Sequence, residues 1–167
     1  MQSDSSQIIL ELFCRVFTKM IFGGVNMASL FDIKSTINSR RSVRSYKMIP
    51  VDDEVMESIK IFAKSMPVPF EHNAEIRFFN ADPTKSLYTA MKSPPNNVAF
   101  MAETDVISIS KVGFVGEFLM LFAQSKGIST CWFGYYKLSE LERLIPHLQS
   151  PSKQKGSNKG YGFLDGE

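Results

Sequence analysis

Apolar residues recur at helical spacing in several segments of the chain. Val55, Ile59 and Phe62 mark the buried face of one such segment, and Asp52, just before it, is suited to cap its first turn. A proline disfavours helix in the residue before it, so this helix should stop before Pro67. By the same reasoning, helices are predicted over residues 28–39, 52–66, 82–91, 115–126 and 139–145.

The ends of the other predicted helices carry local signals. Asp82-Pro83 is suited to open the short helix over residues 82–91. Gly127 is placed to end the most apolar helix, because glycine adopts the left-handed conformation of a helix C-terminus at little cost. Ser139 and Glu142 form a Ser-x-x-Glu capping box, which predicts that the last helix begins at Ser139.

Three shorter runs have the composition of β-strands. Residues 75–80 alternate in polarity, whereas residues 98–102 and 128–133 are almost wholly apolar, as in strands covered on both faces. Helices and strands alternate along the chain, which predicts a layered domain of the α/β or α+β class. The sequence lacks a Gly-x-Gly-x-x-Gly turn after a strand and a Walker lysine motif, so the usual doubly wound nucleotide-binding fold is excluded.

Length and composition indicate one globular domain. The chain has 167 residues, of which 44% are hydrophobic and 14 are phenylalanine, enough for a large apolar core. We assign this domain to residues 27–150. Residues 151–167 are rich in Ser, Lys, Gly and Asn and are predicted to form a mobile tail. The net charge of +2 is too small to indicate a nucleic-acid partner.

Residues 1–26 form a separate segment, in which the run from Ile8 to Phe22 is strongly apolar. Glu11, Arg15 and Lys19 recur at every fourth position and would form one polar stripe on a helix. Three charges argue against a membrane span, and no basic region precedes the apolar run, which argues against a secretory signal. Three interpretations stay open: an amphipathic extension that packs on the domain or a partner, a gene-model artefact ahead of a natural start at Met27, or a membrane-surface helix.

The cysteines and histidines show no pattern of a metal or nucleophilic site. Cys14 and Cys131 are far apart without metal-ligand spacing, so both are predicted to be reduced thiols in a cytoplasmic protein, with Cys131 as a small buried residue. His72 and His147 are the only histidines, and neither has an obvious catalytic partner. We therefore predict no catalytic side chain and no metal ligands.

The first candidate binding feature is the arginine motif, residues 40–46 (RRSVRSY). Arg40, Arg41 and Arg44 surround Ser42, and guanidinium forks with a hydroxyl form a good receptor for a phosphate monoester. Taken alone, the motif equally fits a solvated basic patch, because cations are favourable near the C-terminus of a helix.

The second feature is the tryptophan motif, residues 127–134 (GISTCWFG). Its strand-like part would be buried whatever the function, so Trp132 and Phe133 also fit plain core packing. The two motifs together suggest a phosphate-bearing cofactor held between distant parts of one fold.

The order of these motifs resembles the nitroreductase family of flavoenzymes. The arginine motif, followed by Pro50-Val51 and an acidic helix start, resembles the family's N-terminal signature. Residues 116–121 (GEFLML) and 126–134 are similar to its long central helix and the strand after it, especially in the "TM nitroreductase" branch. The resemblance covers residues 28–150. It implies an α+β fold with a central, mostly antiparallel sheet flanked by helices.

The resemblance also implies the chemistry. It suggests a homodimer with FMN at the interface and NAD(P)H as reductant, which transfers hydride by a ping-pong relay to nitroaromatic, quinone or similar small-molecule acceptors. Arg40, Arg41, Ser42 and Arg44 match the flavin-binding stretch, with Arg40 and Ser42 at the phosphate and ribityl end and Arg44 near the pyrimidine edge. The segment Trp132, Phe133 and Gly134 matches the turn along the other edge of the ring, where a backbone N–H meets N5.

The chain departs from the family after the tryptophan motif. Family members usually continue with a further strand and an arm, whereas here no strand-like run is evident after Phe133. An alternative hypothesis follows: a truncated or degenerate family member that acts as a non-catalytic flavin-binding or interaction module.

Overall fold

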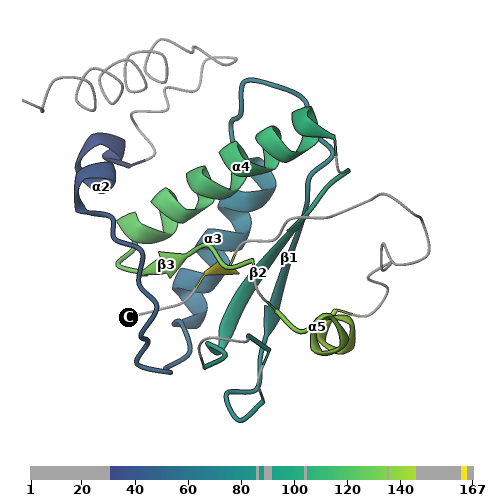
Figure 1. Cartoon of the computed structure of the whole chain (residues 1–167). Coiled ribbons are helices and arrows are strands. Elements are labelled where there is room, and N and C mark those ends of the chain that lie inside the picture. Colours follow the sequence, from purple (N-terminus) through teal and green to yellow (C-terminus); the bar gives the residue numbers. More distant parts are fainter. Residues whose placement is uncertain are drawn as a thin grey trace, which may run out of the picture.

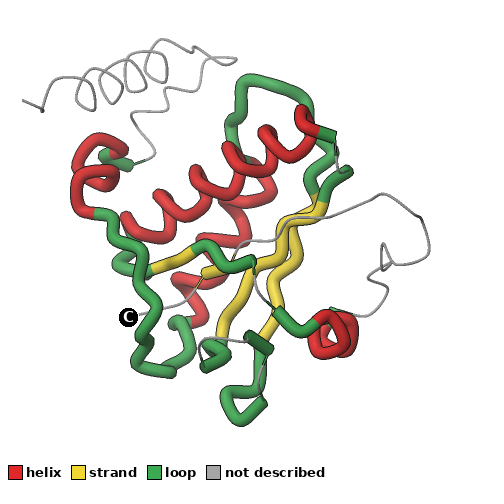
Figure 2. Tube along the Cα trace, viewed as in Figure 1, coloured by secondary structure: helices red, strands yellow, loops and turns green. Residues whose placement is uncertain are grey.

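The structure is a computed structural model, and it describes residues 31–85, 87–88, 92–103, 105–134, 136–145 and 163–164. The expectations for residues 1–26 and for most of the tail 151–167 lie outside these residues. The described elements in chain order are α2 (Ile33–Ser39), α3 (Asp53–Ser65), β1 (Glu75–Asn80), β2 (Asn96–Met101), α4 (Val106–Ser125), β3 (Thr130–Cys131), α5 (Leu138–Leu144) and β4 (Phe163–Leu164) (Figures 1 and 2).

The strands are paired antiparallel, and helices lie against them. β1 pairs with β2 from Glu75 opposite Met101 to Asn80 opposite Asn96. β3 pairs with β4, which also contacts β2, so β4 lies between them in Figure 1. This arrangement confirms the predicted α+β class. The expectation that no strand follows Phe133 was wrong. Phe163 and Leu164 pair with β3, and a strand of two residues within a polar tail is too short to be recognised from the sequence.

The sheet separates two hydrophobic clusters, as the alternation of side chains along a strand requires. On one face, Val98 and Phe100 of β2 pack with α3 and α4 in a cluster that includes Ile59 and Phe118. All six residues of β2 are buried, which confirms the prediction of a strand covered on both faces. On the other face lies a smaller cluster with these buried members: Ala81, Leu87, Tyr88, Ala99, Met101, Leu141 and Ile145.

Aromatic rings dominate the larger cluster. The rings of Phe62 on α3 and Phe122 on α4 stack with centroids 4.0 Å apart and planes 4° apart. Phe118 meets Phe62 edge-on at 5.2 Å, and Phe31 lies within 6.3 Å of all three of these rings. Packing between phenylalanine rings thus holds α3 against α4.

Most helix ends follow the predicted signals. Asp52 caps α3 by accepting hydrogen bonds from the N–H groups of Glu54 and Val55. The helix α3 ends at Ser65, before Pro67. Gly127 follows α4 with a φ of +80°, the left-handed conformation that ends a helix at least cost for glycine.

Three sequence-based predictions were wrong or too long. Residues 82–85 form a turn instead of a helix, because the Asp82 carboxylate accepts from both the backbone N–H and the hydroxyl of Thr84, a local bond that competes with helix formation. The predicted strand over residues 128–133 is reduced to Thr130–Cys131. The helix α5 begins at Leu138 without any side-chain cap, so Ser139 is not its N-cap.

The longest helix, α4, begins nine residues earlier than its apolar spacing predicted. Asp105 starts it by accepting hydrogen bonds from the N–H groups of Ile107 and Ser108, each at 3.0 Å. The first turns of α4 expose Val106, Ile107 and Ile109. Their apolar residues therefore do not form a buried face, which is the pattern from which a helix is predicted.

The cap at Asp105 predicts a pH-dependent contribution to stability. Hydrogen bonds from the Ser108 hydroxyl and backbone lower the pKa of the Asp105 carboxyl below its usual range. A carboxyl with a lowered folded-state pKa stabilises the fold above its unfolded pKa of about 3.9 and loses this effect as the pH falls through the folded value. We expect Asp105→Ala to lower the melting temperature at pH 7, with a deficit that shrinks below about pH 4. Asp105→Asn, which keeps a good cap without the charge, should lose little at pH 7; an Asn variant as unstable as the Ala variant would contradict the capping role.

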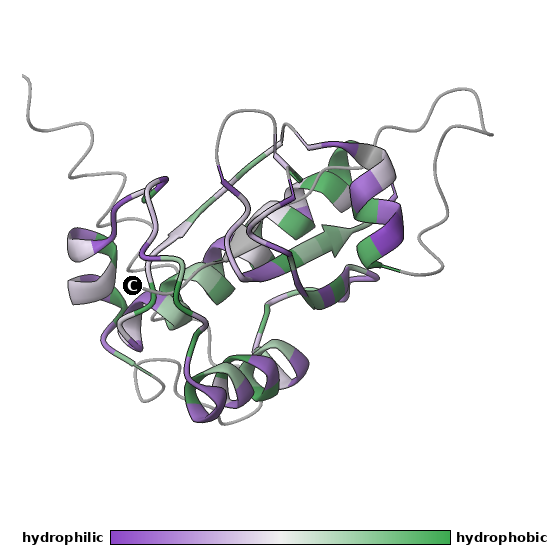
Figure 3. Cartoon of the chain, turned by 90° about the horizontal axis from the view of Figure 1, so that it is seen from below, coloured by the Kyte–Doolittle hydropathy of each residue, from purple (hydrophilic) through white to green (hydrophobic). Residues whose placement is uncertain are grey.

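The composition of α4 also satisfies the requirements of a membrane span. Among the described residues it is the one helix that is long and apolar enough, with a mean hydropathy of 1.8 over its most apolar window. Half of that window is buried inside the fold, as in the core helix of a globular domain. Figure 3 shows the contrast between hydrophobic and hydrophilic stretches of the helices.

Candidate functional site

The two motifs predicted from the sequence lie side by side. Arg40 ends α2 and turns the chain into an extended run, and Ser42 forms a parallel bridge with Thr130 of β3. The backbone N–H of Val43 donates to the Thr130 carbonyl at 3.1 Å, and Tyr46 Oη lies 2.9 Å from Cys131 Sγ. The arginine motif therefore runs beside β3 as a strand would. This brings the two motifs close enough to share one binding site.

Glu117 of α4 joins the motifs through its carboxylate. Its Oε1 lies 3.1 Å from Arg40 Nε, and its Oε2 accepts a hydrogen bond of 3.0 Å from the indole Nε1 of Trp132. The Arg40 side chain is 16% exposed and that of Glu117 is 42% exposed. One acidic group thus fixes the orientation of both Arg40 and Trp132.

Gly116 makes room for the indole ring. A Cβ at this position would overlap the far edge of the Trp132 ring. The ring also lies against Phe100, with centroids 5.5 Å apart, and belongs to the edge of the larger hydrophobic cluster. The Trp132 ring therefore occupies space beside α4 that a side chain at residue 116 would fill.

Replacing Gly116 by alanine is expected to destabilise the fold by about 1–3 kcal/mol, the usual cost of overpacking. The emission maximum of Trp132, the only tryptophan, should shift because the ring must move. Gly113→Ala on the same helix is the matched control: a Cβ there meets nothing within 4 Å, so alanine should be neutral or stabilising. Urea unfolding followed by circular dichroism measures both, and equal stabilities would refute the contact.

The other predicted residues differ in their surroundings. Arg41 is exposed and directs its guanidinium to the carbonyls of Asn38 and Arg40 at 3.4 and 3.1 Å. Ser42 and Arg44 are exposed, and no ion pair holds Arg44 within the described part of the chain. Gly134 is also exposed.

Phe133 faces away from this junction. Its ring meets Tyr88 edge-on at 4.8 Å and packs against the smaller hydrophobic cluster. Its side chain therefore has a packing role, and only its backbone can serve the junction of the motifs.

Two buried polar atoms at this junction have no hydrogen-bond partner among the described residues. They are Arg40 Nε, whose N–H is not aligned with the nearby Glu117 carboxylate, and Thr130 Oγ1. Buried side-chain polar atoms are rarely left unpaired in folded proteins. Arg40 Nε is nevertheless ion-paired with Glu117, whereas Thr130 belongs to the residue pair Ser42–Thr130 that bridges the two motifs.

Glu117 is the functional candidate that the sequence reasoning missed. It is the only charged residue between Lys111 and Lys126, in an otherwise apolar helix. A single acid in a largely buried helix is costly without a partner, which is the signal that could have identified it. Within the described residues, no group of acidic, histidine and cysteine side chains could hold a metal ion.

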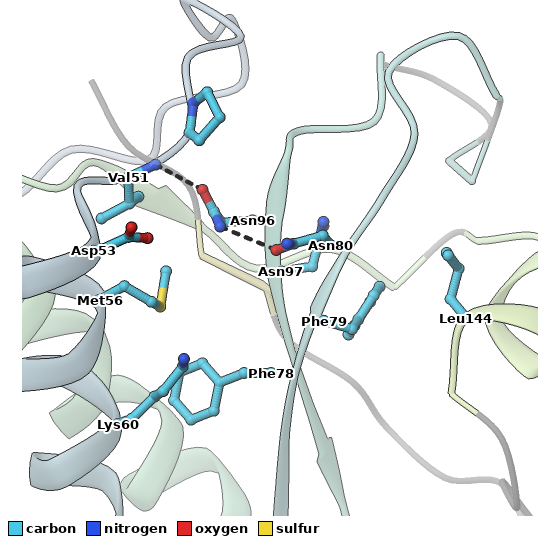
Figure 4. Close-up of a pocket in the computed structure, with 11 residues that line it drawn as sticks. Val51, Asp53, Met56, Lys60, Phe78, Phe79, Asn80, Asn96, Asn97 and Leu144 are labelled. Atoms are coloured by element: carbon cyan, nitrogen blue, oxygen red, sulfur yellow. Dashed lines mark hydrogen bonds between the residues drawn. The ribbon is translucent and has the colours of Figure 1, made fainter.

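Open cavities lie in another part of the fold. One of about 490 Å³ lies between α3 and the ends of β1 and β2, and another of about 540 Å³ lies farther along α3 and β1 (Figure 4). Neither is lined by any of the seven predicted cofactor-binding residues.

Comparisons with known proteins agree with this geometry. A family model described as "Putative TM nitroreductase" matches residues 32–146, a range that contains both motifs. A solved nitroreductase family protein from Clostridium novyi NT matches with a TM-score of 0.57 and 13% identity, over 80% of this chain and 84% of that one. No curated protein sequence matches the chain. At this identity the structural match speaks for the fold, and the family match covers most of the chain.

Proposed function

From the premise that the chain belongs to the nitroreductase family, we propose that it is an FMN-dependent oxidoreductase that uses NAD(P)H. Family membership supports an oxidoreductase role. The finer proposal is that FMN is the cofactor and that nitroaromatics, quinones or similar small molecules accept the electrons. The observation that carries it is the junction itself: two motifs from distant parts of the sequence meet, and exposed cations lie beside the bridge between Ser42 and Thr130.

The residues at the junction fit the anionic end of FMN. Arg41 and Ser42 are exposed, so their donors can reach a phosphate without breaking the core, and Arg44, also exposed, can reach the ring. Thr130, which is bridged to Ser42, has a buried hydroxyl oxygen without a hydrogen-bond partner among the described residues. Glu117 offsets part of the charge of Arg40, so Arg44 is the cation most available to a ligand.

Each part of the chain has a separate task in the proposed reaction. Bound FMN would supply the group that accepts hydride from NAD(P)H and passes it to the acceptor. Arg44 would place a fixed positive charge near the ring, which favours the reduced, more negative form. The backbone of residues 132–134 would offer an N–H to the ring edge. Glu117 would hold Trp132 in place and thereby fix the course of that backbone.

An exposed apolar surface also supports a homodimer, in which a second copy of the chain would cover it. The first turns of α4 expose Val106, Ile107 and Ile109 at 80%, 67% and 48%, which is an apolar surface suited to such a contact. The proposed location is the reducing cytoplasm, where Cys131 would remain a thiol.

The proposed dimer predicts the effect of one charge. Ile107→Glu should shift the protein from dimer to monomer in analytical ultracentrifugation, because a buried carboxylate in an apolar contact is costly. Lys34→Glu, on the exposed surface of α2, should leave the oligomeric state unchanged. An Ile107→Glu variant with the wild-type sedimentation profile would contradict the placement of the interface on α4.

A second candidate is a non-catalytic flavin-binding or interaction module. The observation that favours it is the Glu117 carboxylate, which lies at 3.1 Å from Arg40 Nε and competes with a phosphate for this cation. Such a protein would bind FMN weakly and would not turn over NAD(P)H.

Steady-state kinetics separate the two candidates. The protein reconstituted with FMN should oxidise NADH or NADPH with menadione or nitrofurazone as acceptor, and double-reciprocal plots should give the parallel lines of a ping-pong reaction. Bound FMN without turnover for either acceptor and either nucleotide would favour the non-catalytic module.

A further inference from the structure

A long groove separates α3 from β1 and lies outside the junction of the motifs. The two cavities described above are neighbours, with Lys60 and Phe78 lining both, and together they are here called the α3–β1 groove. Each cavity is within the volume range of small-molecule sites in proteins. Figure 4 shows Lys60 and Phe78 projecting into the part nearest the N-terminal end of α3.

One end of the α3–β1 groove is basic. Lys60 and Lys64 lie one helical turn apart on α3, and His72 and Arg77 also line this end. No carboxylate lines this end among the described residues.

Nearby acids neutralise the basic wall only weakly. Lys60 Nζ lies 3.7 Å from the Glu57 carboxylate, and Arg77 pairs with Glu75. Both pairs are between 40% and 58% exposed, and such pairs contribute little to stability. A carboxylate on a ligand can therefore compete with Glu57 and Glu75, and Lys64 has no ion-pair partner in the described part of the chain.

The floor of the α3–β1 groove is apolar. Ile76 and Phe78 project from the same face of β1, and Ala63 faces them from α3. Ile76 and Phe78 are only partly buried although they pack against the larger hydrophobic cluster. This surface gains hydrophobic stabilisation when a flat apolar group covers it.

The other end is polar and sets the direction of a ligand. The Val51 N–H donates to Asn96 Oδ1 at 2.7 Å, and Asn96 Nδ2 donates to Asn80 Oδ1 at 3.1 Å, so both amides are held in place (Figure 4). Asp53 lines the same end and would repel an anion. The negative group of a ligand therefore belongs beside Lys60 and Lys64, away from Asp53.

We propose that the α3–β1 groove binds a small organic anion with an aromatic body, of the aromatic carboxylate class. The ring lies over Ile76 and Phe78, and the carboxylate meets the ammonium groups of Lys60 and Lys64. None of these residues belongs to the arginine or tryptophan motif, so this site stands whether or not the chain binds FMN.

Calorimetric titration of the full chain with two matched probes tests this site. Naphthalene-2-carboxylate should bind at least tenfold more tightly than naphthalene-2-methanol, which has the same ring without the charge. The double variant Lys60→Met and Lys64→Met should bind the carboxylate at least tenfold more weakly and the alcohol unchanged. Lys34→Met, an exposed lysine on α2, should change neither affinity.

Three results would overturn the proposal: equal affinities for the two probes, a double variant that retains the affinity for the carboxylate, or no heat of binding with either probe. Thermal melting of each variant confirms that it is folded. A Phe78→Leu variant adds an independent test, since loss of the ring surface should weaken the binding of both probes at least threefold. Unchanged binding in that variant would overturn the placement of the ring.

Discussion

Replacing Phe118 by alanine is expected to lower the free energy of unfolding by about 3–5 kcal/mol, the largest effect predicted for a single residue here. Phe118 is 1% exposed at the centre of α4 and contacts the ring of Phe62 edge-on. The neighbouring rings of Phe31 and Phe114 also lie against it, at 6.0 and 6.4 Å. Because α3, α4 and the β1–β2 pair all meet at this cluster, truncation leaves a cavity that no single element can close.

Urea unfolding at neutral pH measures this loss, with Phe118→Leu as the matched control. Leucine keeps most of the buried volume, so it should lose less than about 1.5 kcal/mol. A small domain is stable by about 5–15 kcal/mol, so the alanine variant should remain folded but near its limit. A loss below 1 kcal/mol in Phe118→Ala would contradict the packing of α3 on α4.

Replacing Arg44 by alanine is expected to weaken FMN binding by about 1.5–3 kcal/mol, the range of a charge-assisted hydrogen bond. The equilibrium dissociation constant should rise about 10–150-fold. Arg44 is the cleanest probe of the proposed cofactor site, because it is exposed and no ion pair holds it in the described structure. Arg40→Ala would also leave Glu117 without its partner and so mix binding with stability.

Lys47 provides the matched control for Arg44. It is an exposed cation three residues further along the same segment, so Lys47→Ala removes the same charge at nearly the same place. We expect it to change the dissociation constant of FMN less than threefold, as measured by quenching of flavin fluorescence. Equal losses in Arg44→Ala and Lys47→Ala would indicate a general effect of charge and would remove Arg44 from the site.

The residue types of the arginine and tryptophan motifs suggested that they share one site, and the resemblance to a family implied the same. Periodicity placed α3, β1, β2 and the C-terminal half of α4 correctly, because each buries a regular set of apolar residues against the sheet or the adjacent helix. It could not show that Ser42 pairs with Thr130, because pairing between distant strands depends on backbone hydrogen bonds that leave no trace in one sequence.

The failures have physical causes of the same kind. Residues 82–85 have the composition of a helix start. Hydrogen bonds from Thr84 to the Asp82 carboxylate stabilise a turn there instead of a helix. α5 begins without the Ser139 cap because the N–H of Lys137 donates to the Leu87 carbonyl, and this tertiary contact sets where the helix starts. In β3, Trp132 leaves the strand to reach Glu117 on α4, so the apolar run is longer than the strand.

The link between Arg40, Glu117 and Trp132 is the feature of the site that sequence reasoning did not foresee. The prediction that Arg40, Arg41, Ser42, Arg44, Trp132, Phe133 and Gly134 hold a cofactor stays a prediction. The structure brings the two motifs together but gives Phe133 a packing role and Arg40 an acidic partner. Glu117 therefore decides how much of the arginine charge is left for a ligand.

The visible absorption spectrum of the purified protein tests the central proposal most directly. It would be recorded with and without added FMN, before and after anaerobic addition of NADH or NADPH. We predict an oxidised-flavin band that stays with the protein through gel filtration and bleaches when one of the nucleotides is added. Protein that retains no flavin after reconstitution would contradict the assignment of an FMN-dependent oxidoreductase, and retained flavin that neither nucleotide bleaches would leave only the non-catalytic module.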